Sequence, residues 1–145
     1  MGTVTHFHEK YRHKQIDFER KTLRDLSIQK IESNVEMYFE NFLKPMGEYQ
    51  QTICDMCMDY GIEAYLFGAS FGRMGYYGET ETSVYLRSEK RLKELTEDLF
   101  DFWTFWYGAE DLVYESLYFS CEAFLYSWWK EGFQTTIKRL RMRLH

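Results

Sequence analysis

Two cysteines with the spacing Cys54-x-x-Cys57 come closest to a reactive motif in this 145-residue sequence. Such a pair can exchange disulfides or supply two of the four ligands of a zinc ion. The third cysteine, Cys121, leaves a zinc site one ligand short unless an N-terminal histidine completes it. No pattern of a thioredoxin-like βαβ unit surrounds the pair. We therefore predict that the cysteines serve as small apolar side chains of a core.

Motifs of the familiar enzyme classes are missing from the sequence. It holds no phosphate-binding loop, no nucleotide-binding glycine fingerprint, no Gly-x-Ser-x-Gly elbow and no zinc-protease motif. Di-metal centres in helical bundles use Glu-x-x-His pairs, whereas the four histidines lie near the chain ends, at positions 6, 8, 13 and 145. The sequence thus favours a protein that is not an enzyme, and we predict no catalytic residues, no cofactor and no metal site.

A stripe of small residues is the most unusual feature of the sequence. A helical projection at 100° per residue places seven of them within a sector of about 80°: Cys54, Cys57, Gly61, Ala64, Gly68, Gly72 and Gly75. Each glycine inside a helix costs up to about 1 kcal/mol relative to alanine, so four on one face indicate a close approach. We predict that another helix packs here, either an aromatic-rich helix of this chain or a second copy of the same helix.

The alternative is that a ligand occupies the face of the glycines. A pocket between this stripe and neighbouring aromatic rings would then bind a small molecule or a metal. Its candidate ligand-binding residues are Tyr60, Tyr65, Gly68, Gly72, Arg73, Tyr76 and Tyr77.

Four long helices are predicted from apolar residues that recur at three- and four-residue steps. They cover residues 23–43, 46–74, 83–107 and 110–144. Pro45 suits the start of the second helix, and Thr80 or Thr82 suits the N-cap of the third. Gly108 is a plausible stop for the third helix, and Gly132 is the point where the fourth is expected to break or bend.

The fold class that follows is all-α. A single proline leaves little to interrupt long helices, and short connections between such helices favour antiparallel neighbours. We predict one domain over residues 1–145, with an irregular N-terminal arm over residues 1–22 and an up-and-down bundle of about four helices over residues 23–144.

Charge and cysteine use restrict the environment and the partners of the protein. The formal net charge is −5, with basic ends and an acidic middle, which argues against nucleic-acid binding as the main role. No window approaches the roughly 20 apolar residues of a membrane span, so we predict no membrane partner. An odd number of cysteines without an export signal predicts a cytoplasmic location.

The segment Ile62–Glu79, read as IEAYLFGASFGRMGYYGE, resembles a segment of small uncharacterised proteins from Bacillus-type bacteria. The resemblance implies a cytoplasmic bacterial protein without an established activity. It carries over no catalytic residues.

A surplus of large aromatic residues suggests how such a bundle would act. Trp128 and Trp129 are adjacent and point about 100° apart, so both are buried only if the helix is covered over a wide arc. We therefore predict a non-enzymatic bundle that associates with a protein partner or forms a homo-oligomer through exposed aromatic surface. The basic residues of the final segment, around Arg139 and Arg141, are expected to have a structural role.

Overall fold

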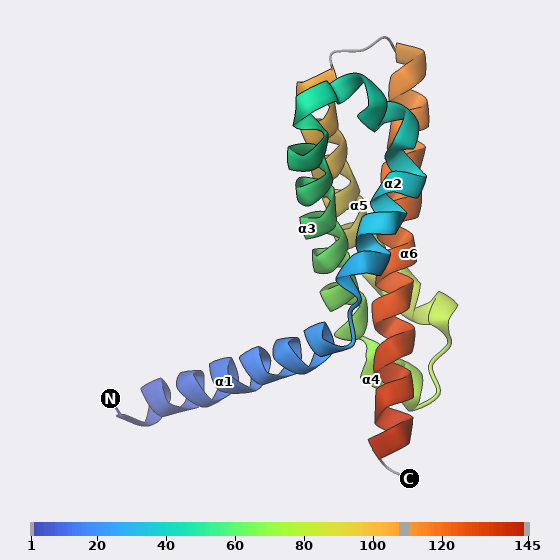
Figure 1. Cartoon of the computed structure of the whole chain (residues 1–145). Helices are drawn as coiled ribbons and strands as arrows, with labels where there is room; N and C mark the ends of the chain where they lie inside the picture. The colour runs from blue at the N-terminus through green and yellow to red at the C-terminus, as the bar shows by residue number, and fades with distance from the viewer. Residues whose placement is uncertain (1, 108–110, 144–145) are drawn as a thin grey trace.

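The computed structural model describes residues 2–107 and 111–143, and these residues form helices without a strand (Figure 1). The all-α class is thereby confirmed. The elements in chain order are α1 (Gly2–Arg24), α2 (Ile28–Leu43), the 3-10 helix η1 (Lys44–Tyr49), α3 (Gln50–Ala69), α4 (Gly72–Tyr76), α5 (Glu81–Tyr107) and α6 (Asp111–Arg143).

The N-terminal segment is a long helix, so the prediction of an irregular arm over residues 1–22 is wrong. After Gly2, α1 contains neither glycine nor proline, the two residues that most disfavour a helix. The side-chain amide of Gln15 donates a hydrogen bond to the carboxylate of Glu19, one turn later, at 3.2 Å. The charged residues from Glu9 to Glu19 lie on the exposed or partly exposed surface of this helix.

The corner between α1 and α2 is held by both local and distant contacts. Ser27 caps α2 by accepting a hydrogen bond from the backbone N–H of Lys30 at 3.2 Å. Arg139 of α6 forms an ion pair with Asp25 at 2.9 Å. The helix predicted to start at Leu23 therefore starts at Ile28, because the chain turns between Arg24 and the Ser27 cap.

The second predicted helix, over residues 46–74, is in fact three elements. Gly47 has a φ of 55° and interrupts the helical backbone just after Pro45. At the other end, the hydroxyl of Ser70 donates a hydrogen bond to the carbonyl of Phe67, and α3 ends at Ala69. A side chain that bonds the preceding turn competes with helix continuation.

The later helices lie close to their predicted ranges. Thr80 accepts a hydrogen bond from the backbone N–H of Ser83 at 3.2 Å, so α5 begins at Glu81 with the predicted cap. The predicted break or bend at Gly132 does not occur, since α6 is continuous from Asp111 to Arg143. The predicted stop at Gly108 lies outside the described residues.

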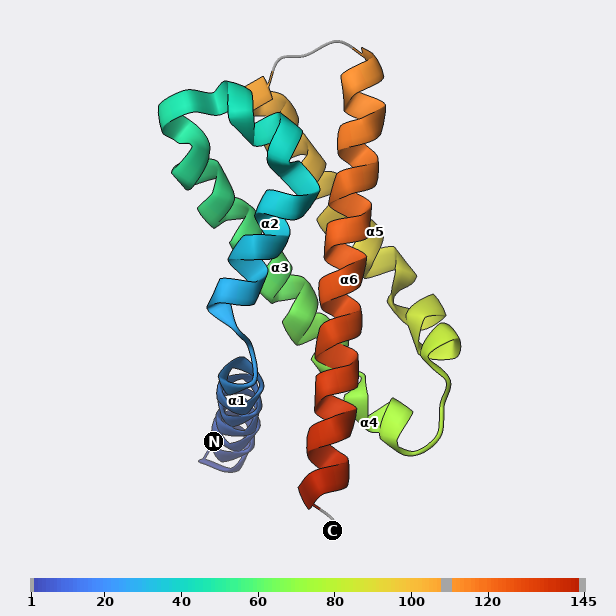
Figure 2. The same ribbon diagram turned by 45° about the vertical axis from the view of Figure 1, so that its right-hand side comes forward.

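Helices α2, α3, α5 and α6 pack together (Figures 1 and 2), and α1 extends away from them (Figure 1). The most extensive contact joins α3 to α6. At their crossing, a Cβ on Gly68 would overlap the carbonyl oxygen of Trp129, and a Cβ on Gly132 would overlap the carbonyl oxygen of Tyr65. The two glycines thus bring the two backbones together from both sides.

Large aromatic side chains fill the core around this crossing. Trp103, Trp128 and Trp129 are all at most 2% exposed. Phe39 stacks on Trp103 with ring centroids 5.2 Å apart. Both Trp128 and Trp129 are therefore covered within the chain, and neither needs a second copy to bury it.

Candidate functional site

The structure does not gather the seven predicted ligand-binding residues into one site. Tyr65, Gly68 and Gly72 are buried against neighbouring elements, and the hydroxyl of Tyr65 donates a hydrogen bond to the carbonyl of Thr22 at 3.2 Å. Burial raises the pKa of Tyr65 to about 12. The others are wholly or partly exposed and are spread along α3 and α4: Tyr60, Arg73, Tyr76 and Tyr77.

The face of the glycine stripe is occupied by α6. The backbone of Trp129 lies against Gly68, and the side chain of Thr136 lies against Gly72. The predicted packing of an aromatic-rich helix on this stripe is confirmed. An open space lies beside the last member of the stripe, Gly75.

The three cysteines are free and buried. Burial raises the pKa of Cys54 to about 11 and raises the pKa values of Cys57 and Cys121 further above the ordinary value. A protonated thiol is a poor nucleophile and a poor metal ligand. Among the described residues, no three His, Cys, Asp or Glu side chains are grouped so that they could hold a metal ion.

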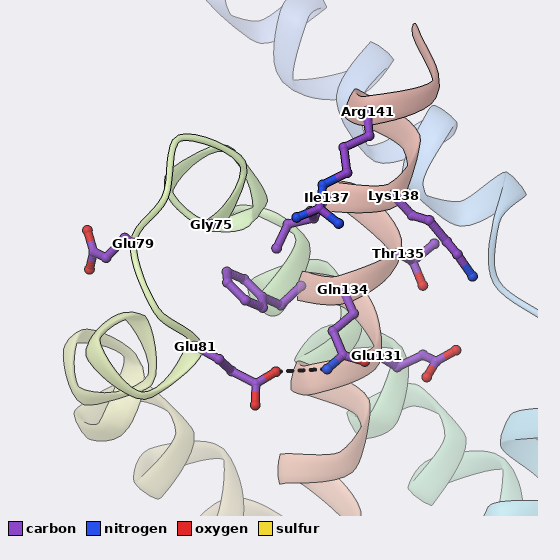
Figure 3. Close-up of a pocket in the computed structure, with 10 residues that line it drawn as sticks. Gly75, Glu79, Glu81, Glu131, Gln134, Thr135, Ile137, Lys138 and Arg141 are labelled. Carbon is purple, nitrogen blue, oxygen red and sulfur yellow. Dashed lines mark hydrogen bonds between the residues drawn. The ribbon is translucent and has the colours of Figure 1, made fainter. Parts of the chain in front are cut away.

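An open cleft of about 580 Å³ lies beside Gly75, between the α4–α5 connection and the C-terminal part of α6 (Figure 3). None of the seven predicted residues lines it. Its apolar wall includes Phe133 and Ile137, and a Cβ on Gly75 would crowd both side chains. The cleft is thus built partly from the last glycine of the stripe.

The carboxylates of this cleft all have partners within the chain. The contacts are Glu79 with Arg87 at 3.2 Å, Glu81 with Gln134 at 3.0 Å, and Glu131 with Lys30 at 2.8 Å. Within the described chain, Lys138 and Arg141 take part in no ion pair. Arg141 extends toward Ile137, whereas Lys138 points to the other side of α6 (Figure 3). Among the described residues, the guanidinium of Arg141 thus lies near an apolar wall without an ion-pair partner.

A second hollow, which we call the aromatic groove, lies between α5 and α6. Two adjoining cavities of about 140 and 400 Å³ share Tyr85, Glu122 and Tyr126. Tyr85 contacts Tyr126 edge to face, with ring centroids 5.0 Å apart. Phe119 lines the outer cavity and is 60% exposed. The groove therefore offers aromatic surface to solvent between two rigid helices.

Unpaired carboxylates border the aromatic groove. Glu89 and Glu122 line it, and neither forms an ion pair within the described residues. Burial raises the pKa of Tyr85, and the charges of Glu89 and Glu122 raise it further. Burial likewise raises the pKa of Tyr118, with Glu122 and Glu97 adding to the shift. Lys93 is the cation that lines the groove, so acidic charge predominates.

The residues of the aromatic groove were not predicted from the sequence, although a signal exists. The buried residues of α6 include Leu117, Phe124 and Trp128. Phe119 and Tyr126 are seven residues apart and lie on another face of the same helix. A second aromatic face on a helix that already has a buried face indicates a surface with its own role.

Helix α1 presents a basic surface away from the bundle. It holds six of the 18 Lys and Arg residues and three of the 23 Asp and Glu residues, so its formal charge is +3 and that of the remaining chain is −8. Tyr11 is 67% exposed. Phe18 is half-buried and Thr22 is buried, at the end of α1 that meets α3.

The comparisons with known proteins define a family. The chain belongs to the family described as a protein of unknown function, DUF2521, which matches residues 1–145. It is 30% identical over 146 residues to "Uncharacterized protein YbaK" of Bacillus subtilis (strain 168), and the match covers 99% of each chain. No solved structure matches the chain significantly. The resemblance to Bacillus-type proteins predicted from Ile62–Glu79 is thus confirmed.

No helix among the described residues is long and apolar enough to cross a membrane.

Proposed function

We propose that this protein acts without catalysis, by binding another protein through the aromatic groove between α5 and α6. The observation that carries the proposal is Phe119, a large apolar ring that is 60% exposed beside the partly exposed rings of Tyr85 and Tyr126. Aromatic residues that combine apolar area with a polar edge are enriched at the centres of protein interfaces. The unpaired carboxylates at the border would select a basic partner.

The rest of the fold has a supporting role in this proposal. We treat α2, α3, α5 and α6 as an up-and-down bundle whose tight α3–α6 crossing keeps the groove rigid. A rigid scaffold lowers the entropic cost of binding. A cytoplasmic location is also part of the proposal, and the three free, buried cysteines support it.

Site-specific photo-crosslinking tests this proposal in the host organism. A photoreactive phenylalanine analogue replaces Phe119 in one strain and Phe105 in a control strain. Phe105 is 82% exposed and lies outside the groove, so it is at least as accessible. We expect a discrete crosslinked protein from position 119 and none from position 105. Equal crosslinking at the two positions, or none at either, would contradict the proposal.

A second candidate function is binding of a small anion in the cleft beside Gly75. The observation in its favour is Arg141, which extends toward Ile137 and forms no ion pair with the described residues, while the carboxylates of the cleft are paired. This arrangement suits a carboxylate attached to an apolar group. Native mass spectrometry of protein purified from its host tests it. We expect a retained small molecule that Arg141→Gln removes, whereas ligand-free protein would leave the aromatic groove as the stronger candidate.

A further inference from the structure

We propose that the partner bound in the aromatic groove is helix α1 of a second copy of this chain. The inference rests on the proposed function and specifies its partner. It joins two observations that are independent of each other: an acidic aromatic groove on the bundle, and a basic helix that stands away from the same bundle.

The first step is that α1 needs a covering surface. Isolated helices are only marginally stable in water, and most helices in proteins depend on the packing of one face. Helix α1 has 23 residues but meets the rest of the chain mainly where its C-terminal turns contact α3. The remainder extends away from the bundle in Figure 1, whereas Figure 2 shows the same helix nearly end-on.

The second step is the pattern on α1 itself. At 100° per residue, Tyr11, Phe18 and Thr22 lie within about 40° of one another on one face. Lys10, Lys14 and Lys21 all flank that face on the same side. The helix therefore carries a narrow aromatic edge with lysines beside it.

The third step is that this edge matches the groove. Phe119, Tyr85 and Tyr126 supply the aromatic surface that Tyr11 would cover. The carboxylates of Glu89 and Glu122 have no partner within the described chain and would meet the lysines that flank the edge. A helix of 23 residues is about 35 Å long, which exceeds the roughly 17 Å that the groove spans along α5 from Tyr85 to Thr96.

Charge also favours docking of α1 in the groove of a second copy over a contact between two α1 helices. Two α1 helices each carry a formal charge of +3 and would repel each other, whereas the bundle carries −8. A reciprocal exchange, in which each copy places its α1 on the other copy, satisfies both surfaces with two-fold symmetry.

Charge reversal on each surface tests the inference in the full-length protein. The α1 variant is Lys14→Glu/Lys21→Glu, and the groove variant is Glu89→Lys/Glu122→Lys. We expect the wild type to be a dimer by sedimentation equilibrium and each variant to dimerise about 100-fold more weakly, because like charges then face each other. The matched control, Glu36→Lys/Glu48→Lys, changes two exposed carboxylates on α2 and η1 and should leave the dimer intact.

Mixing the two variants gives the sharpest result. In a mixed dimer, the acidic α1 of one variant meets the basic groove of the other, and the unmodified α1 meets the unmodified groove, so both contacts are complementary. We expect an equimolar mixture to recover dimerisation. Circular dichroism of each variant checks that the bundle is folded.

Several outcomes would overturn the inference, and they differ from those that would overturn the proposed function. A wild type that is monomeric at all micromolar concentrations would exclude the second copy as partner, and so would a dimer that the α1 variant leaves unchanged. If Phe119 still crosslinks to a different protein in either case, the groove remains an interaction site. If the mixture stays monomeric although each variant is folded, the docking of α1 in the groove is excluded.

Discussion

Helices α6 and α1 are the two termini of this fold, and they meet the rest of the chain in opposite ways. Helix α6 contacts α2, α3, α4 and α5, and its buried residues include the fully covered rings of Phe124 and Trp129. Helix α1 contacts α3 mainly through its last turns, and Tyr11 is 67% exposed.

Composition explains the difference between these two helices. Over Leu117–Phe133, α6 carries apolar residues around most of its circumference, together with one glycine that admits the backbone of α3. Helix α1 carries nine formally charged residues and only a narrow aromatic edge. A helix with the composition of α6 is stabilised by packing within its own chain. A helix with the composition of α1 becomes stable when another surface covers its apolar edge.

The largest expected effect concerns the α3–α6 crossing. Gly68→Ala should lower the free energy of unfolding by about 1–3 kcal/mol or more, because the new Cβ would overlap the rigid carbonyl of Trp129. Gly75→Ala is the matched control. Its neighbours are side-chain atoms of Ile137 and Phe133 rather than a backbone carbonyl, and these side chains can shift where the backbone cannot, so Gly75→Ala should cost less than Gly68→Ala. Denaturant unfolding of both variants measures the difference, and equal stabilities would mean that the crossing is not tight.

A smaller effect is expected where α5 meets α6. The indole N–H of Trp129 donates a hydrogen bond to the hydroxyl of Ser88 at 3.1 Å, and both side chains are fully buried. Ser88→Ala leaves that N–H without a partner and should cost about 1–3 kcal/mol. The companion variant Ser83→Ala removes an exposed hydroxyl and should cost less than about 0.5 kcal/mol. Thermal unfolding of the pair decides whether the buried bond stabilises this contact.

Much of the fold could be predicted because local signals and packing agree. Helix α5 begins at Glu81, only two residues before its predicted start. The prediction is close because the Thr80 cap and the spacing of the apolar residues indicate the same boundary. Gly132 was misread because a glycine that breaks a helix and a glycine that admits a neighbouring backbone look alike in a sequence. The interruption after Ala69 was missed because the apolar pattern continues through Phe71 into α4.

The candidate site was harder to predict than the fold. The glycine stripe indicated a close approach, and the structure identifies α6 as the helix that fills it. The aromatic groove needs the relative position of α5 and α6, which no local pattern gives. Phe119 and Tyr126 share a face of α6, but only the structure brings Tyr85 and Glu89 of α5 beside them.

The buried cysteines make the stability of the bundle depend on pH at the alkaline end. Burial raises the pKa of Cys54 from 9.0 to about 11 in the folded state. A raised pKa stabilises the fold below the ordinary thiol pKa, and this contribution is lost as the pH rises from about 9 to 11, because the unfolded thiol releases its proton first. Melting temperatures should therefore fall across this range. The melting temperature of the Cys54→Ala variant should fall less steeply with pH than that of the wild type. An equally steep decline in both proteins would assign the effect to other groups.

The smallest expected effect concerns the exposed aromatic edge of α1. Tyr11→Ser removes a ring that is 67% exposed and that packs on no part of the core, so the unfolding free energy of the isolated chain should change by less than about 0.5 kcal/mol. The same variant should weaken dimerisation if α1 docks on a second copy, and its melting temperature should then fall below that of the wild type only at high protein concentration. Calorimetry over a range of concentrations separates the two effects. A loss of stability that is equally large at every concentration would mean that α1 is held by its own bundle, and the contrast between α1 and α6 would no longer stand.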